Sequence, residues 1–192
     1  LYETVLGFVL GTAAGTLIAI TLWWSPAINR VLDPYLVVLN ALPKIALGPI
    51  LIVWFGAGIT SIIVMALLIS FVVTIMSVLA GFNEITGEKQ LLMKTLGASK
   101  LQIFTMVVLP ASLPTIMNAL KISVGMSWVG VIVGEYLVSK AGLGYLIVYG
   151  GQVFKLDLVM ASIVVLCLLA ALMYYGVAYM EKKLVRWRMH GG

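Results

Sequence analysis

The chain reads IALGPILIVWFGAGITSIIVMALLISFVVTIMSVLAGFN from Ile45 to Asn83, and none of these 39 residues carries a charge. A helix needs about 20 mainly apolar residues to cross a bilayer, so this stretch is long enough for two crossings. The turn-forming sequence Gly56-Ala57-Gly58 interrupts it. The sequence therefore predicts a hairpin of two spans, over residues 45–55 and 59–82.

The composition of the whole chain supports this interpretation. Its 192 residues are 62% hydrophobic and only 10% charged, and its mean hydropathy is +1.15. Soluble domains are about 25% charged, and disordered chains have low hydrophobicity, so both classes are excluded. The remaining class is an all-α polytopic membrane protein, because helices satisfy their backbone hydrogen bonds within lipid. In such a protein a net charge of +5 reports loop topology and not nucleic-acid binding.

Three further stretches are long and apolar enough to span, over residues 4–24, 113–137 and 158–180. Five spans in one transmembrane domain, residues 1–192, are therefore predicted. The first arm of the hairpin is short and contains Pro49, and an alternative start lies before Pro43, near Tyr35. Since Leu1 is not Met and lies within an apolar segment, we also expect that an N-terminal part precedes this sequence.

Basic residues outside the spans predict the orientation, because cytoplasmic loops are rich in Lys and Arg. If the C-terminus is cytoplasmic, nine basic residues lie inside: Arg30, Lys44, Lys89, Lys94, Lys100, Lys182, Lys183, Arg186 and Arg188. Only Lys140 and Lys155 then lie outside. Trp23-Trp24 and Trp187 are expected at the membrane interfaces. A single cysteine, Cys167, and a single histidine, His190, offer no disulfide framework and no metal site.

The longest polar stretch between spans is the predicted cytoplasmic loop, residues 83–110. Glu88 to Leu96 is predicted to form a short helix with leucines on one face. Gly97 suits the residue that ends a helix in a left-handed conformation, and Ser99-x-x-Gln102 fits a capping box that opens a second helix. Pro110 and Pro114 are expected to delay or bend the entry into the next span. The leucine face fits a docking surface and, equally well, a helix lying flat in the lipid interface.

Two other sets of residues stand out within the spans. Gly7, Gly11 and Gly15 repeat at four-residue spacing, which favours close helix packing. Five residues of the fourth span are candidates for the lining of a translocation path: Asn118, Lys121, Ser127, Trp128 and Glu135. Ionisable groups within a membrane tend to face protein or water. The alternative is that Lys121 and Glu135 extend toward the two ends of their span.

The loop of residues 83–110 resembles the corresponding loop of a known protein family. Gly97, nine residues and then Val107-Val108-Leu109-Pro110 are similar to the signature loop of membrane subunits of ABC importers, E-A-A, three residues, Gly, nine residues, I-x-L-P. Leu91-Leu92-Met93 occupy the E-A-A positions, and Glu88 lies one helical turn earlier. Four stretches resemble the nitrate/sulfonate/taurine-type branch of these permeases: residues 43–49, 54–58, 128–135 and 142–145.

The resemblance implies a type I ABC importer permease fold in the inner membrane of a bacterium. It implies coupling to an ATPase through Glu88, Leu91, Leu92, Lys94, Leu96, Gly97, Ala98, Ser99 and Pro110. The implied partners are two copies of an ABC ATPase, a second permease subunit in a homodimer or with a similar chain, an extracytoplasmic solute-binding protein and the lipid bilayer. The chain has no Gly-rich loop ending in Gly-Lys-Ser/Thr, so we expect no bound cofactor, no catalytic residue, and ATP use by the partner alone.

The solute implied by the branch is a sulfonate, taurine, nitrate or a similar small anion, with a thiamine-precursor-like heterocycle as the alternative. A self-contained secondary transporter or channel is the other transport hypothesis, and the loop after Asn83 argues against it. An intramembrane enzyme needs a catalytic set. Glu135 is the only carboxylate near the interior of a predicted span, so this class is disfavoured.

Overall fold

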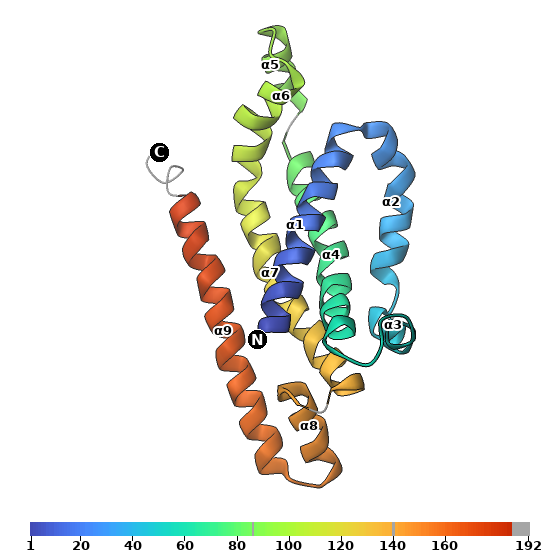
Figure 1. The fold of residues 1–192 in the computed structure, drawn as a ribbon. Helices are drawn as coiled ribbons and strands as arrows, with labels where there is room; N and C mark the ends of the chain where they lie inside the picture. Colours follow the sequence, from blue (N-terminus) through green and yellow to red (C-terminus); the bar gives the residue numbers. More distant parts are fainter. Residues whose placement is uncertain (86, 140, 186–192) are drawn as a thin grey trace.

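The computed structural model describes residues 1–85, 87–139 and 141–185, and within these ranges the chain is helical without strands. Figure 1 shows an elongated bundle with α5 at one end and α8 at the other. Four helices of the described chain are long and apolar enough to cross a membrane: α1 (Tyr2–Trp24), α4 (Ile59–Asn83), Lys100–Val138 and α9 (Leu156–Leu184). The third of these has 39 residues and consists of α6 (Lys100–Ile103), the π-helical turn η2 (Phe104–Val108) and α7 (Leu109–Val138). The shorter elements are α2 (Pro26–Ala41), η1 (Lys44–Leu47), α3 (Gly48–Phe55), α5 (Gly87–Thr95) and α8 (Leu143–Gln152). The fold class predicted from composition is therefore confirmed.

Helix α4 is the centre of the bundle and packs along both α1 and α7. Gly7, Gly11 and Gly15 are buried on the face of α1 that meets α4. A methyl group added at Gly7 would lie 2.6 Å from the Ala66 Cβ, and one added at Gly15 would lie 2.9 Å from the Thr74 Cβ. Small residues therefore let the two helices approach closely, as expected where lipid removes the hydrophobic drive for association.

The same part of α4 meets glycines from α7. A methyl group added at Gly130 would lie 2.9 Å from the Ala66 backbone nitrogen, and one added at Gly134 would lie 3.0 Å from the Ile62 Cα. Ala66 is consequently enclosed between Gly7 of α1 and Gly130 of α7, and it is fully buried. We call this three-helix contact, formed by the glycines at 7, 11, 15, 130 and 134 against α4, the α4 seam.

The chain between α1 and α4 differs from the prediction. Residues 45–55 do not form a span of their own, because α3 has eight residues and is about 12 Å long. Helix α2 instead runs from the α5 end of the bundle toward the opposite end, where η1 and α3 turn by 85°. The number of five spans holds only if this bent pair counts as one. Composition did not mark α2 as a span because Arg30 and Asp33 interrupt it.

This path also moves one basic residue. Lys44 follows α2, and Gly48 just after it lies against Leu137 near the end of α7, so Lys44 lies toward the α8 end of the bundle. Its amine donates to the Asn40 carbonyl at 3.1 Å. The prediction that Lys44 lies on the same side as α5 is therefore wrong. Six described basic residues remain toward the α5 end: Arg30, Lys89, Lys94, Lys100, Lys182 and Lys183. The predictions for Lys140, Arg186, Trp187, Arg188 and His190 lie outside the described residues.

The two prolines do not separate the second loop helix, α6, from its span. Residues 100–138 form one continuous helix, in which the π-helical turn η2 ends two residues before Pro110. A proline has no N–H to donate, and a π turn accommodates that loss within a helix. The Ser112 hydroxyl lies 2.7 Å from the Val108 carbonyl and 3.0 Å from the Gly81 carbonyl. The predicted delay at Pro110 and Pro114 is therefore wrong, because α6 joins α7 in one helix, whereas the bend predicted as its alternative stays a prediction.

Candidate functional site

The strongest candidate site is α5 with the turn that follows it. Gly97 has a φ of +79°, a left-handed conformation that favours glycine. Its N–H donates to the Lys94 carbonyl at 3.0 Å, and the Ala98 N–H donates to the Met93 carbonyl at 3.0 Å. This pair of bonds is a Schellman motif, which ends α5 and satisfies its last carbonyl groups. The predicted glycine bend is confirmed.

The next helix begins one residue later with a capping box. The Ser99 N–H donates to the Gln102 Oε1 at 2.7 Å, and the Gln102 N–H donates to the Ser99 Oγ at 3.3 Å. These bonds satisfy two backbone donors that a helix start leaves free. Because Gly97 and Ser99 each fix their own turn, the direction of α5 relative to α6 is set by local bonds.

The leucines of α5 point away from the bundle. Leu91 and Leu92 are each 61% exposed and Leu96 is 74% exposed. Met93 and Ala98, in contrast, pack against the core cluster at this end of the molecule. Helix α5 and the turn after it are therefore held through Met93 and Ala98, while three large apolar side chains beside them stay exposed.

Other predicted coupling residues occupy different positions. Glu88 is exposed near the start of α5, whereas Lys94 lines a cavity between α5 and the end of α1. Pro110 lies in the first turn of α7, beyond η2 and apart from the α5 turn. The structure thus gathers the predicted residues from 88 to 99 around one helix and turn, and leaves Pro110 outside that group.

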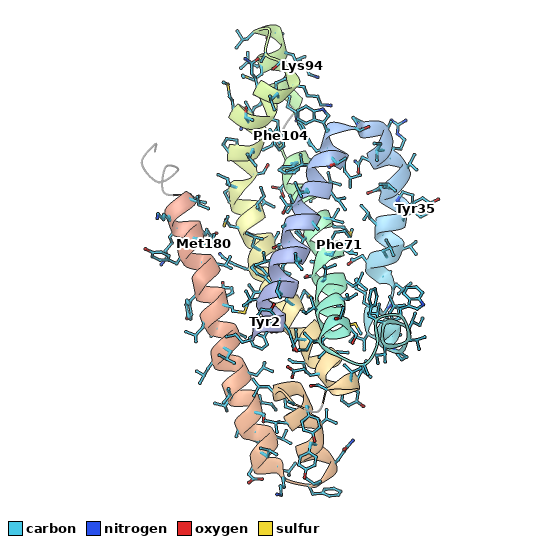
Figure 2. All side chains as sticks on the ribbon, viewed as in Figure 1. Tyr2, Tyr35, Phe71, Lys94, Phe104 and Met180 are labelled. Carbon is cyan, nitrogen blue, oxygen red and sulfur yellow. The ribbon has the colours of Figure 1, made fainter. Side chains whose placement is uncertain are left out.

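An aromatic cluster fixes the base of the loop, at the end of the molecule where Lys94 and Phe104 are labelled in Figure 2. The Phe104 ring lies 5.0 Å from the Trp23 ring and 5.5 Å from the Phe82 ring, measured between centroids. The Lys100 amine donates to the Trp24 carbonyl and lies within 6 Å of both tryptophan rings. Trp23 and Trp24 were predicted to lie at a membrane interface, but their contacts with Lys100 of α6 were not predicted.

Of the five candidate path residues, only Trp128 and Glu135 line one cavity, of about 300 Å³, among the described residues. Asn118 is exposed, whereas Lys121 forms an ion pair of 2.5 Å with Glu181 of α9. Glu135 is buried and accepts a hydrogen bond of 2.6 Å from the Gly144 N–H at the start of α8. Their role in a path stays a prediction.

Two of the five are buried without a partner for their polar atoms. Among the described residues, neither the Ser127 hydroxyl nor the Trp128 indole N–H has a hydrogen-bond partner. Trp128 packs with Val124 and Val177 between α7 and α9. Within the described ranges no three His, Cys, Asp or Glu side chains come together as a metal site would require.

Comparison with known proteins agrees with this arrangement. The family described as "Binding-protein-dependent transport system inner membrane component" matches residues 7–186. The chain is 32% identical over 177 residues to the taurine transport system permease protein TauC of Escherichia coli, with 92% of this chain and 64% of that protein covered. It is 31% identical over 183 residues to the formylaminopyrimidine transport permease protein ThiX of Halalkalibacterium halodurans, with 95% and 73% covered.

The chain therefore spans about two thirds of the length of these relatives. Its fold is similar to that of a chain in inward-facing conformations of the MetNI methionine ABC transporter, with a TM-score of 0.76, 20% identity, and 95% of this chain and 89% of that chain covered. A match to a family over nearly the whole sequence, combined with a shared fold, identifies the class of protein. The chain belongs to the binding-protein-dependent transport system inner membrane components, the membrane permease subunits of ABC importers.

Proposed function

We propose that this chain is the translocating subunit of an ATP-driven importer, and that α5 transmits movement from a separate ATPase. The observation that supports this most is the exposure of Leu91, Leu92 and Leu96 on a helix and turn that Met93 and Ala98 hold against the core. Burying one leucine side chain contributes about 2 kcal/mol. A partner that covers all three would therefore gain substantial binding energy.

The connection from α5 to the spans is rigid enough to carry movement. The Gly97 turn and the Ser99 capping box join α5 to α6, and α6 continues as one helix to Val138. A displacement of α5 would thus reach the α8 end of the bundle through a single rod. Transport coupling requires such an element to make different contacts in two states.

In this proposal α5 and the C-terminus lie in the cytoplasm. Six described basic residues lie toward the α5 end, and Lys44 and Lys155 lie toward the α8 end. The proposed complex contains two ATPase subunits, a second permease subunit and an extracytoplasmic solute-binding protein. The chain itself binds no cofactor, and the ATPase hydrolyses ATP.

The proposed solute is a small anion such as a sulfonate, taurine or nitrate. The name of the Escherichia coli relative, a taurine permease, supports this class. The Halalkalibacterium relative is named for formylaminopyrimidine at nearly the same identity, so a thiamine-precursor-like heterocycle is the alternative. Binding measurements on the partner solute-binding protein with taurine, nitrate and formylaminopyrimidine distinguish the two.

The docking role is tested by co-purifying the full-length permease with its ATPase. Replacing Leu92 and Leu96 with Asp should weaken the complex at least tenfold, because two carboxylates would have to be desolvated in an apolar contact. A matched control is Leu156→Asp, which changes a leucine that is 69% exposed at the opposite end of the bundle. Unchanged ATPase binding by L92D/L96D would exclude α5 as the docking element and favour a self-contained carrier or channel.

A further inference from the structure

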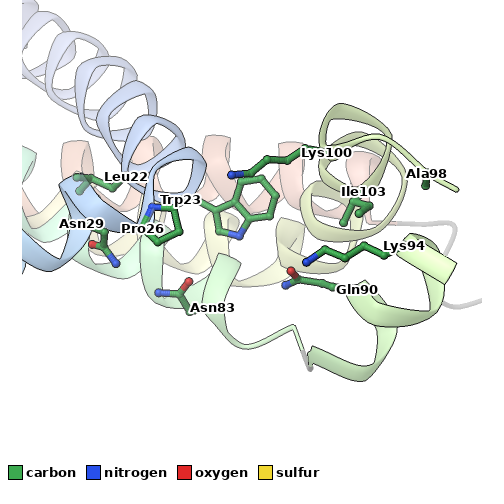
Figure 3. Close-up of a pocket in the computed structure, with 10 residues that line it drawn as sticks. All are labelled: Leu22, Trp23, Pro26, Asn29, Asn83, Gln90, Lys94, Ala98, Lys100 and Ile103. Atoms are coloured by element: carbon green, nitrogen blue, oxygen red, sulfur yellow. The ribbon is translucent and has the colours of Figure 1, made fainter.

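A cavity of about 400 Å³ lies behind α5, between this helix, the start of α6 and the turn from α1 to α2. Figure 3 shows its lining, in which Lys94, Lys100 and Gln90 approach the Trp23 ring from the loop side. Asn29 and Asn83 line the other side. None of the exposed leucines at 91, 92 and 96 lines it, so the docking surface proposed above does not account for it.

The lining is rich in hydrogen-bond donors and positive charge. It contains two lysines, three amides and an indole, and no carboxylate. Among the described residues the Lys94 amine makes no ion pair and no hydrogen bond, and the Lys100 amine donates only to the Trp24 carbonyl. Two ammonium groups that line one cavity with no carboxylate in its lining favour an anion there.

One buried polar atom also lacks a partner. The Asn29 Oδ1 is inaccessible to solvent and accepts no hydrogen bond within the described ranges. An acceptor without a partner is costly to bury, and a rotation of the Asn29 side chain that brings this amide to the cavity would let its NH2 donate to an anion there.

We propose that this cavity binds a phosphate group, supplied either by the headgroup of an anionic phospholipid or by free phosphate. Lysine is a common phosphate ligand, and basic pockets between spans bind anionic headgroups at the cytoplasmic surface. The cavity lies where α1 ends in Trp23 and Trp24, at the level expected for headgroups. Only its assignment to the cytoplasmic side rests on the proposed function.

The bound phosphate would join two parts of the molecule. Gln90 and Lys94 belong to α5, whereas Trp23 and Asn29 belong to α1 and α2. A ligand that touches both sets would restrain α5 against the bundle. Binding is therefore expected to slow hydrogen exchange of the α5 amides, a readout that needs neither ATPase nor transport.

The test uses the full-length permease, delipidated in detergent, and native mass spectrometry with phosphatidylglycerol, phosphatidylcholine or inorganic phosphate. Wild type should bind phosphatidylglycerol saturably, and Lys94→Gln combined with Lys100→Gln should weaken that binding at least tenfold. Lys89→Gln is the matched control, because Lys89 is exposed on α5 and does not line the cavity. Since Lys100 also contacts Trp24, Lys94→Gln alone and the charge-preserving Lys94→Arg separate loss of charge from loss of folding.

Competition between the probes identifies the source. Displacement of phosphatidylglycerol by inorganic phosphate supports a site for free phosphate, and binding of the lipid without displacement supports a headgroup site. If wild type and the Lys94→Gln/Lys100→Gln variant bind phosphatidylglycerol and inorganic phosphate equally well, the proposal is overturned. Absence of saturable binding by wild type would overturn it as well, and ATPase binding would remain as a separate result.

Discussion

The α4 seam and the turn after α5 both require glycine, but for different physical reasons. In the seam Gly130 is needed because a side chain would enter the backbone of Ala66, 64 residues away along the chain. In the turn Gly97 has no atom within 4 Å of where a Cβ would be, and it is needed because its φ is +79°. The room for a side chain at a glycine thus depends on how distant helices pack, whereas the need for a left-handed backbone angle depends on the local turn.

The largest expected effect is in the seam. Gly130→Ala should destabilise the permease by about 3 kcal/mol, because the atoms in the way are backbone and the helices must separate. The measurement is the thermal midpoint of detergent-purified protein by size-exclusion chromatography. Gly125→Ala is the matched control on the same helix, with no atom within 4 Å. Equal midpoints for the two variants would show that α4 and α7 do not pack as described.

Gly11→Ala should cost less, about 2 kcal/mol, because the obstructing atom is the Ser70 hydroxyl and not backbone. The second substitution Ser70→Ala removes that atom and should restore part of the loss. A double-mutant cycle of thermal midpoints measures this coupling. Additive effects would contradict the contact between α1 and α4.

Gly97→Ala should cost about 1 kcal/mol, the penalty for a left-handed residue with a side chain. The effect should be confined to the turn and appear as weaker ATPase co-purification with little change in thermal midpoint. Gly97→Asn, which tolerates this conformation better, should be milder. A loss of midpoint as large as that of Gly130→Ala would contradict the distinction between the two regions.

Ser99→Ala should have the smallest effect, under about 1 kcal/mol, because the capping box is exposed and only one of its two bonds is lost. The measurement is hydrogen exchange of the Gln102 amide, which should become faster because its bond to the Ser99 hydroxyl is lost. Thr105→Ala is the control, since this exposed residue of the same helix only bonds the preceding turn. Unchanged exchange at Gln102 would mean that the box does not hold the helix start.

The features predicted correctly from the sequence are mainly the local ones, and the features missed depend mainly on how helices pack. Gly97, Ser99 and Gln102 were predicted correctly because each acts on atoms within a few residues. The helix α2 was missed as part of a possible span because Arg30 and Asp33 lower its hydropathy, and the predicted side of Lys44 was wrong for the same reason. The ion pair of Lys121 with Glu181 and the bond from Gly144 to Glu135 could not be read from spacing, because each joins different helices.

The sequence by itself determined that the chain is a helical membrane protein with a capped, leucine-bearing helix between two spans. It did so because hydropathy, caps and left-handed glycines are local properties. Only the tertiary structure decided that Ala66 is enclosed between Gly7 and Gly130, and that Lys94 and Lys100 share a cavity with Asn29. These contacts depend on how each helix is rotated about its axis, which is set by all of its neighbours at once.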